Sequence, residues 1–361
     1  MSQSQAFSPD YATARERFRQ GATRLGWKLE AHPIGGVGSQ GEELTLDVGY
    51  SPGSDANKVL VVSSGVHGVE GFFGSAVQVA LLGEWAAESM PPVKCLFLHG
   101  LNPFGFAWLR RFDENNVDPN RNFLLPEERY AGSPPGYAEL DALLNPRHPP
   151  SRWEPFTLRA LWAIARHGMP ALRQAIAGGQ YDFPRGLFFG GAAPSRMNQL
   201  LQENLGRWLR GSQQVVHLDF HTGLGGMGTW KLLMDYPLSP MQRTQLTDWF
   251  GADSFEACDS SQIAYEARGG LGRWCVASHL APQYLFACAE FGTYGPIQVL
   301  AGLRKENQAH HWGIPAAPST LRAKEGLKEL FCPASNAWRS SVLAQSLTLV
   351  NQALQGLAGV Q

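Results

Sequence analysis

Short hydrophobic runs separated by stretches of helical periodicity form the dominant pattern along this chain. Residues 43–49 (ELTLDVG) alternate apolar with other positions, as a half-buried strand does. Residues 58–64 (KVLVVSS) are more continuously apolar, which is typical of a strand buried on both faces. A helical period at residues 69–87 then leads to another strand at 93–99 (VKCLFLH). This strand–helix–strand order predicts a crossover unit and a partly parallel sheet.

The remaining chain continues the alternation, with one long interruption. Residues 124–155 are rich in proline, glycine and charge and are expected to run over the surface, and residues 181–195 (YDFPRGLFFGGAAPS) are expected to form an aromatic loop. We predict an α/β fold, a three-layer α/β/α sandwich with a mixed, partly parallel sheet. Residues 1–361 are expected to form one domain with an insertion at about 124–195. Further helices are expected at 157–177, 196–210, 296–311 and 335–357, and further strands at 214–220, 230–236 and 284–291.

Composition narrows the classes of protein to consider. Of the 361 residues, 44% are hydrophobic and 17% charged, a balance that supports a large core and argues against disorder. The formal net charge of -1 makes nucleic acid and anionic membranes weak candidates as partners. The five cysteines include no CxxC pair, so we expect reduced thiols and no disulfide framework. Because the chain shows no secretory signal and no run of about 20 apolar residues, we expect a cytoplasmic protein.

The segment SSGVHGVEG places His67 and Glu70 directly after a buried strand, where a helix begins. An imidazole and a carboxylate three residues apart at such a position can turn toward one point. Three protein ligands and one water form the usual plan of a catalytic zinc site. The alternative is an ordinary solvated helix start, because this pair of residues also occurs by chance.

A second segment, VVHLDFHTGLGG, carries three polar side chains on one strand face. His217, Asp219 and His221 share that face because side chains alternate with a period of two. His221 stands at the carboxyl end of the strand, where open α/β sheets place their sites. His217 lies deeper and is better explained as a hydrogen-bonded core histidine. Asp219 is either a ligand or the acceptor that orients a histidine ligand.

Two further segments add charged groups. The loop NPFGFAWLRRFDENNVDPNRNF contains Arg110, Arg111 and Arg121, whose guanidinium groups can donate paired hydrogen bonds to a carboxylate or an oxyanion. A loop held by structural asparagine turns is the alternative. Glu290 ends the apolar strand of ACAEFGTYG, and burial there would raise its pKa into the range of a general base. The alternative is a carboxylate exposed at the strand's end.

Together these segments resemble the zinc carboxypeptidase superfamily, in the branch that includes succinylglutamate desuccinylase and aspartoacylase. The chain is most similar to a bacterial carboxypeptidase-like group of poorly assigned function. The motifs follow the family's order and span residues 58–295, roughly two thirds of the chain. They are HGVE at 67–70, NPFG at 102–105, VDPNRNF at 117–123, DFHTG at 219–223 and EFGT at 290–293.

The resemblance implies a hydrolase with one zinc ion per chain, which cleaves an amide bond next to a carboxylate. It implies a small peptide or an N-acyl amino acid as the substrate, so a deacylase of the same fold is the nearest alternative. His67, Glu70 and His221 match the zinc ligands, and Asp118 matches the acceptor for the first histidine. Glu290 matches the general base.

The resemblance assigns the substrate contacts less sharply. Asn120 and Arg121 match the pair that binds the substrate's terminal carboxylate. The arginine that polarises the scissile carbonyl is one of the adjacent Arg110 and Arg111; we favour Arg111 and keep Arg110 as a substrate-binding residue. The tyrosine that digestive carboxypeptidases place over the substrate has only two possible matches, Tyr265 and Tyr294.

Two interpretations from other classes of protein compete with the interpretation as a hydrolase. Residues 223–228 (GLGGMG) match the dinucleotide-binding pattern G-x-G-x-x-G, but TWKLLMDY follows as a strand where that pattern requires a helix. We expect these glycines to keep backbone close to the metal pocket. A non-catalytic metal-binding protein would have lost its base, whereas Glu290 is present. His310 and His311 are expected to be a surface feature, and residues 187–191 (LFFGG) to line the pocket or to pack in the core.

Overall fold

A computed structural model describes residues 3–51, 55–85, 90–151, 153–168, 178–258 and 267–359. Within these ranges one mixed sheet has the strand order β1-β2-β4-β3-β5-β8-β6-β7. The neighbours β4, β3, β5 and β8 run parallel, while β1, β2 and β6 join antiparallel. The strands are β1 (Lys28–Val37), β2 (Glu43–Tyr50), β3 (Asp55–Ser64), β4 (Val93–His99), β5 (Gln214–Thr222), β6 (Trp230–Met234), β7 (Phe255–Ala257) and β8 (Gln283–Phe291).

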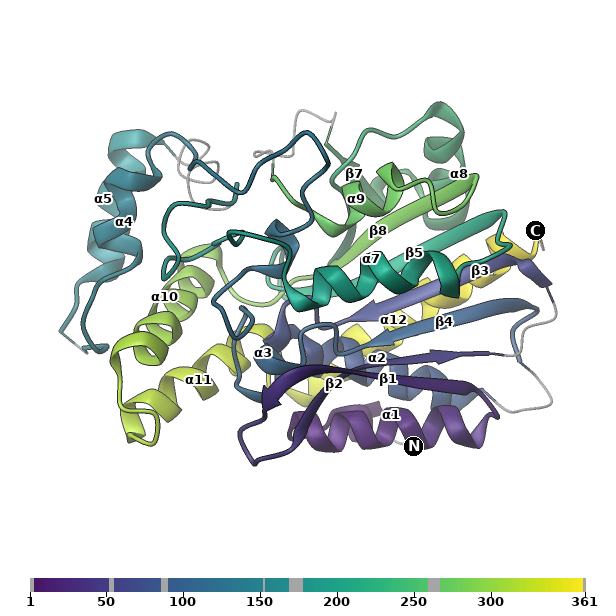
Figure 1. Cartoon of the computed structure of the whole chain (residues 1–361), viewed down its shortest axis with the longest axis horizontal. Coiled ribbons are helices and arrows are strands. Elements are labelled where there is room, and N and C mark those ends of the chain that lie inside the picture. Colours follow the sequence, from purple (N-terminus) through teal and green to yellow (C-terminus); the bar gives the residue numbers. More distant parts are fainter. Residues whose placement is uncertain are drawn as a thin grey trace.

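Helices cover both faces of this sheet, so the predicted three-layer α/β/α class is confirmed (Figure 1). Helices α1 (Tyr11–Arg24), α2 (Gly71–Glu84) and α12 (Asn336–Ala358) pack on one face, and α8 (Pro240–Phe250) lies beside α12. Helices α7 (Arg196–Trp208) and α9 (Leu271–Ala277) lie on the other. Short helices are η1 (Gln3–Ala6), η2 (Gly68–Glu70), α3 (Pro103–Ala107), η4 (Pro119–Arg121) and η5 (Ala252–Ser254).

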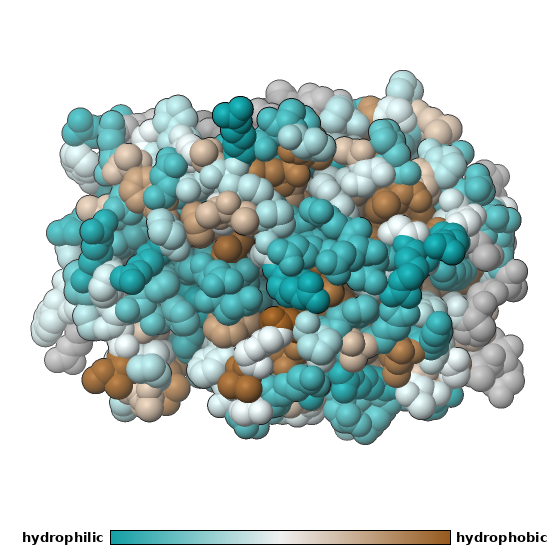
Figure 2. Space-filling model, in the orientation of Figure 1, coloured by the Kyte–Doolittle hydropathy of each residue, from teal (hydrophilic) through white to brown (hydrophobic). Residues whose placement is uncertain are grey.

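Four more helices gather at one end of the sheet, at the left of Figure 1, near the end where β4 leads into α3. They are α4 (Tyr137–Leu144), α5 (Phe156–His167), α10 (Pro296–Trp312) and α11 (Pro318–Phe331). This is the carboxyl end of the parallel strands, where such sheets place their sites. Figure 2 shows a mainly hydrophilic face in this view, with hydrophobic residues in small separate groups. In the part of the chain that the structure describes, no helix has the length and apolar character to cross a membrane.

The central strand β3 shows why a continuously apolar run is buried on both faces. Val59, Leu60, Val61 and Val62 are fully buried, because β3 lies between β4 and β5 with helices above and below. Burial of each such side chain contributes roughly 1.5–3 kcal/mol. The strands predicted at 43–49, 58–64, 93–99, 214–220, 230–236 and 284–291 all form.

Several elements escaped prediction. The edge strand β1 alternates exposed with half-buried positions and contains Pro33, Gly35 and Gly36, so its sequence has little strand character. Helix α4 lies inside the stretch expected to be a surface loop, because Tyr137 and Leu144 bury against Phe183. Helices α8, α9 and α11 were also missed. Of the helix expected at 157–177, α5 ends at His167, and residues 169–177 lie outside the described residues.

Gly292 directly follows β8, and we expect Gly292→Ala to destabilise the fold by about 1–3 kcal/mol. A Cβ atom there would lie 1.9 Å from the Gly226 carbonyl oxygen, so backbone must shift. Gly326→Ala in α11 is the matched control, since nothing lies within 4 Å of its Cβ position. Urea denaturation of both variants measures the difference, and equal stability would contradict the prediction.

Candidate metal centre

Three buried side chains meet at the carboxyl ends of β3 and β5. His67 lies in the turn after β3, Glu70 ends η2, and His221 is the penultimate residue of β5. Their ligand atoms all lie within 4.8 Å of one another. His67 Nδ1 is 2.8 Å from Glu70 Oε1, and His221 Nδ1 is 3.0 Å from Glu70 Oε2. The structure thus brings together the three predicted zinc ligands.

The second nitrogen of each imidazole faces another carboxylate. His67 Nε2 lies 3.2 Å from Asp118 Oδ1, without hydrogen-bond geometry. His221 Nε2 lies 2.5 Å from Asp219 Oδ2. Two imidazole nitrogens and a carboxylate, with carboxylates behind the rings, are a donor set that suits zinc. The gathering of buried carboxylates also favours a dication between them, so these residues fit the implied metal.

The charges of this cluster depend on one another. Burial alone would raise the pKa of Glu70, but His67 and His221 outweigh it and hold that pKa well below its usual range. Burial disfavours the imidazolium of His221, yet Asp219 and Glu70 raise its pKa well above the ordinary value. The backbone N–H of Thr222 also donates to Glu70 Oε2 at 3.0 Å. Glu70 is therefore held as a carboxylate between the two rings.

Glu290 lies beside this cluster, at the end of β8 and directly across from His221 in the sheet. Burial and the neighbouring Glu70 raise the pKa of Glu290 to about 7. Its Oε1 accepts a hydrogen bond from the backbone N–H of Leu224 at 2.9 Å. Glu290 is only 7% exposed, so the reading as a carboxylate at an exposed strand end does not hold. A buried carboxylate that titrates near neutrality can exchange protons as a general base.

The raised pKa of Glu290 predicts a pH-dependent stability in protein stripped of metal. The folded chain holds this proton up to about pH 7, whereas an unfolded chain releases it near 4.5. Stability therefore falls as pH rises between these values, by roughly 3 kcal/mol relative to Glu290→Gln, which cannot titrate. Urea unfolding of both proteins at pH 4 and pH 8, with chelator present, measures this. A constant difference between the two proteins would contradict it.

Arg111 reaches the cluster and Arg110 does not. Arg111 Nε donates to Asp118 Oδ2 at 2.9 Å, and its Nη1 lies 3.5 Å from Glu70 Oε1. The guanidinium also lies over the Phe188 ring, 5.4 Å from its centroid. By contrast, the fully buried Arg110 points into a separate network, where it donates to Glu306, Asn307 and Asn116. The predicted substrate contact of Arg110 is thus corrected, because α10 binds its guanidinium.

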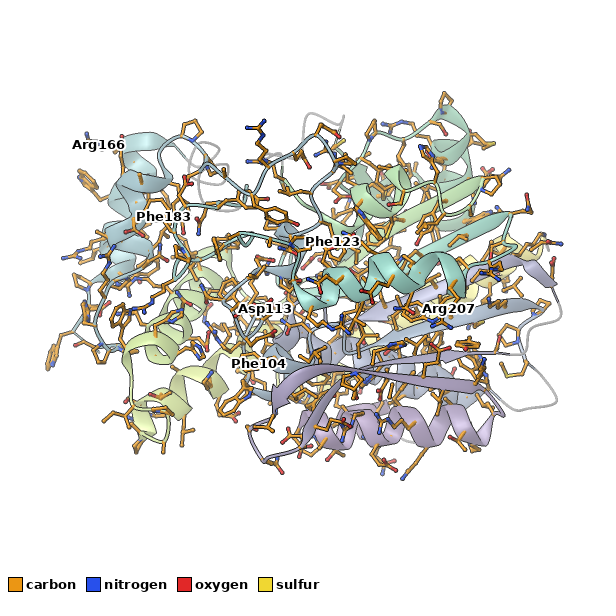
Figure 3. All side chains as sticks on the ribbon, in the orientation of Figure 1. Phe104, Asp113, Phe123, Arg166, Phe183 and Arg207 are labelled. Carbon is orange, nitrogen blue, oxygen red and sulfur yellow. The ribbon has the colours of Figure 1, made fainter. Side chains whose placement is uncertain are left out.

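The loop after β4 carries these arginines across the end of the sheet. Phe104, Asp113 and Phe123, labelled in Figure 3, mark its course from the side of β1 and β2 toward α9. Asp113 accepts from the backbone N–H groups at 115 and 117, and Phe123 packs against Trp274 of α9 at 5.2 Å. Asp118 begins η4, where it accepts from the Asn120 N–H at 3.1 Å. The loop is held at both ends, which fixes Asp118 and Arg111.

Asn120 and Arg121 lie on η4, beyond Asp118. Asn120 Oδ1 accepts from the backbone N–H of Leu271 at 2.9 Å. Arg121 is buried and packs along Gly179, where a Cβ would lie 2.7 Å from the arginine Cδ. Tyr294 donates to Glu329 at 2.7 Å, whereas Tyr265 lies outside the described residues.

A family model described as "Protein of unknown function (DUF2817)" matches residues 7–345. The chain belongs to this family. No curated protein matches this DUF2817 chain. Several solved structures also resemble this chain.

Three of those solved structures give the range of the likeness. A "putative metallopeptidase" from Shewanella amazonensis is 17% identical, with 90% of this DUF2817 chain and 94% of that chain covered and a TM-score of 0.44. Bovine thrombin-activatable fibrinolysis inhibitor, in complex with tick carboxypeptidase inhibitor, is 12% identical, with 94% and 97% covered and a TM-score of 0.47. Murein-tripeptide amidase from Escherichia coli O157 is 15% identical, with 78% and 95% covered and a TM-score of 0.40.

Strand β5 carries two histidines, and only His221 reaches the candidate metal centre, while His217 lies deeper in the core. His217 Nε2 is 2.8 Å from Ser63 Oγ and its Nδ1 is 2.9 Å from the Tyr284 hydroxyl. Burial lowers the pKa of His217 to about 4, so it is a neutral core histidine, as predicted. Asp219 accepts from Ser63 Oγ at 2.6 Å while it faces His221 Nε2. Of the two alternatives left open for Asp219, this contact favours the one in which Asp219 orients His221.

We expect Asp219→Asn in this DUF2817 protein to lower zinc affinity by roughly 10- to 100-fold. The amide keeps the side chain's size but loses the charge that fixes His221. Competition with a chromophoric chelator measures the affinity. Asp248→Asn on the exposed part of α8 is the control. Unchanged affinity in Asp219→Asn would rule out the orienting role.

The glycine-rich segment of the DUF2817 chain links two strands. The strand β6 follows it, as expected, so the helix needed for dinucleotide binding is missing from this described segment. Gly223 has a φ of +132°, and its Cβ position lies 3.9 Å from Glu290 Oε1 and 2.9 Å from Phe331. The glycine keeps backbone close to the metal pocket, as predicted. His310 and His311 are half-buried rather than fully at the surface, because they lie near the network of Arg110 and Glu306.

Sequence reasoning missed Cys288 and the Leu224 N–H at this site, and it left open whether residues 187–191 line the pocket or pack in the core. Phe188 and Leu187 pack with Val69 and Phe331 in a small hydrophobic cluster, so core packing explains that segment while Phe188 also contacts Arg111. Cys288 lies two residues before Glu290 on the same face of β8. Its position two residues from the predicted base was the available signal. The hydrogen bond from the Leu224 N–H to Glu290 could not be predicted from the sequence, because every residue except proline has a backbone N–H.

Proposed function

We propose that this protein is a zinc-dependent hydrolase that cleaves an amide bond next to a carboxylate. The observation that carries the proposal is Glu290, a buried carboxylate whose pKa is raised to about 7, beside the set His67, Glu70 and His221. The three ligands would hold one zinc ion per chain. Bound there, the ion would supply a Lewis acid that activates water and polarises a carbonyl.

Glu290 handles the proton in this proposal. Its Oε2 can take a proton from the attacking water and pass it to the leaving amine, while Oε1 stays held by the Leu224 N–H. The raised pKa makes both transfers accessible near neutral pH. The enclosed position also keeps bulk water from competing for the proton.

Arg111 is the group proposed to stabilise the oxyanion. Its Nε is bound to Asp118 and the ring of Phe188 supports its plane, so an N–H can be held toward the reacting carbonyl without reorganisation. Such a preorganised donor is worth roughly 10²–10³ in kcat. This arrangement supports an enzyme over a binding protein, because Glu290 and Arg111 would supply a base and an oxyanion donor beside the three proposed ligands.

Arg121 and Asn120 are proposed to hold the substrate's carboxylate and set its register. A small peptide and an N-acyl amino acid both carry that carboxylate beside the amide. The segment 124–195, proposed as an insertion into a single domain, contributes to this side of the site. From it, Tyr181 donates to the Arg121 carbonyl at 2.8 Å, and the Phe189 carbonyl accepts from the Asp118 N–H at 2.6 Å.

Metal analysis combined with matched substrates tests this proposal. Elemental analysis is expected to give about one zinc per chain, with activity lost on chelation and restored by zinc. N-acyl amino acids and dipeptides are assayed beside the same compounds with an amidated C-terminus, which lack the carboxylate. Hydrolysis restricted to the free acids supports the proposal, and the acyl group preferred separates deacylase from peptidase. Protein that cannot be loaded with zinc, or equal cleavage of the amides, contradicts it.

A further inference from the structure

A thiol lies beside the proposed base. Cys288 Sγ is 3.9 Å from Glu290 Oε2, on the same face of β8. The ligand atoms of His221, Cys288 and Glu290 lie within 4.8 Å of one another, as do those of the first set. Cys288 is partly exposed, whereas His221 and Glu290 are buried.

The two sets of ligand atoms share His221 and compete for one nitrogen. Its Nε2 is held by Asp219 at 2.5 Å, and Asp219 is in turn fixed by Ser63. Only Nδ1 remains to bind an ion, and it already faces Glu70 at 3.0 Å. An ion can therefore occupy the set with His67 and Glu70 or the set with Cys288 and Glu290, but His221 cannot serve both at once.

We propose that His221, Cys288 and Glu290 form a second metal site, which takes soft divalent ions such as Cd²⁺ and excludes metal from the first site. A thiolate ligand selects soft ions, whereas the imidazole and carboxylate ligands of the first site suit zinc. The thiol proton passes to water as the sulfur–metal bond forms, so no redox partner is needed.

The position of Cys288 in the sheet leaves one structural alternative to metal binding. The competing explanation is a small side chain that fills space between Asp219 and Leu233, its neighbours across the sheet.

Soft ions would also block the reaction, a consequence that rests on the proposed function. An ion in the second site would bind Glu290, the proposed base, and would take His221 away from the first site. Inhibition by cadmium would then act by displacement within the active site rather than at a distant surface thiol.

Cadmium titration of chelator-treated full-length protein tests the second site without any substrate. We expect an ultraviolet sulfur-to-cadmium charge-transfer band in wild type, its loss in Cys288→Ser and its retention in His67→Ala. Cys258→Ser, which removes an exposed cysteine, is the matched control and keeps the band. Cadmium NMR of wild type reports a thiolate ligand independently, in case Cys288→Ser does not fold.

The outcomes separate this inference from the proposed function. Zinc binding that is lost in His67→Ala tests the first site, and the cadmium band tests the second. No band in wild type, or a band that persists in Cys288→Ser, overturns the second site even if zinc binds normally. A cadmium band without any zinc binding overturns the proposed function and leaves the second site standing.

Discussion

Replacing Glu290 by glutamine is expected to lower kcat by roughly 10²–10⁴-fold while zinc content stays at about one ion per chain. Glutamine keeps the side chain's size and can still accept the hydrogen bond that Leu224 donates to Oε1 at 2.9 Å. It cannot take a proton from water at any accessible pH. The loss therefore falls on the chemical step, and KM is expected to change little.

The measurement is steady-state kinetics on the substrate found for wild type, with zinc quantified in the same preparations. Glu128→Gln, which removes a carboxylate paired with Arg273 outside the metal centre, is the control and should keep full activity. Near-normal turnover in Glu290→Gln would remove Glu290 as the base. Loss of zinc together with activity would mean that Glu290 acts on the metal and would leave the proton transfer without support.

Removal of His221 is expected to abolish stable zinc binding. The loss should exceed the roughly 10- to 100-fold that removal of an orienting partner costs, because one of three protein ligands is gone. Glu70 also loses the contact at 3.0 Å that helps to keep it ionised between the two histidines. Activity is expected to disappear with the metal.

His217→Ala is the matched control for His221→Ala. Both histidines lie on β5, face the same side of the sheet and are buried, but His217 contacts Ser63 and Tyr284 instead of the cluster. Elemental analysis after dialysis compares the two variants, with far-ultraviolet circular dichroism to verify folding. Zinc retained in His221→Ala, or lost equally in both, would contradict the assignment of His221 as a ligand.

The candidate metal centre is assembled from parts that lie far apart in the sequence. The turn after β3 supplies His67 and Glu70, β5 supplies His221, and β8 supplies Glu290. Parallel pairing sets His221 directly across from Glu290, and Ser63 of β3 across from Asp219. The sheet register therefore decides which of these strand side chains meet.

The sequence by itself determined the fold class and pointed to the residues of the candidate metal centre. Runs such as KVLVVSS are apolar at every position only when helices cover both faces, and this pattern predicts β3. A histidine or glutamate at the end of such a run, as at His221 and Glu290, is expensive to bury without a partner. These signals are local, so they can be read from a few neighbouring residues.

Only the tertiary structure decided which neighbours these residues have. It brought Arg110 to Glu306, His221 to Glu70 and Ser63 to Asp219. Arg111, next to Arg110 in the sequence, turns toward Glu70 instead. Adjacent arginines have the same composition and nearly the same local pattern, so no local rule separates them. The physical reason is that strand order and loop path fix contacts between residues more than a hundred positions apart, while side-chain periodicity extends over only a few.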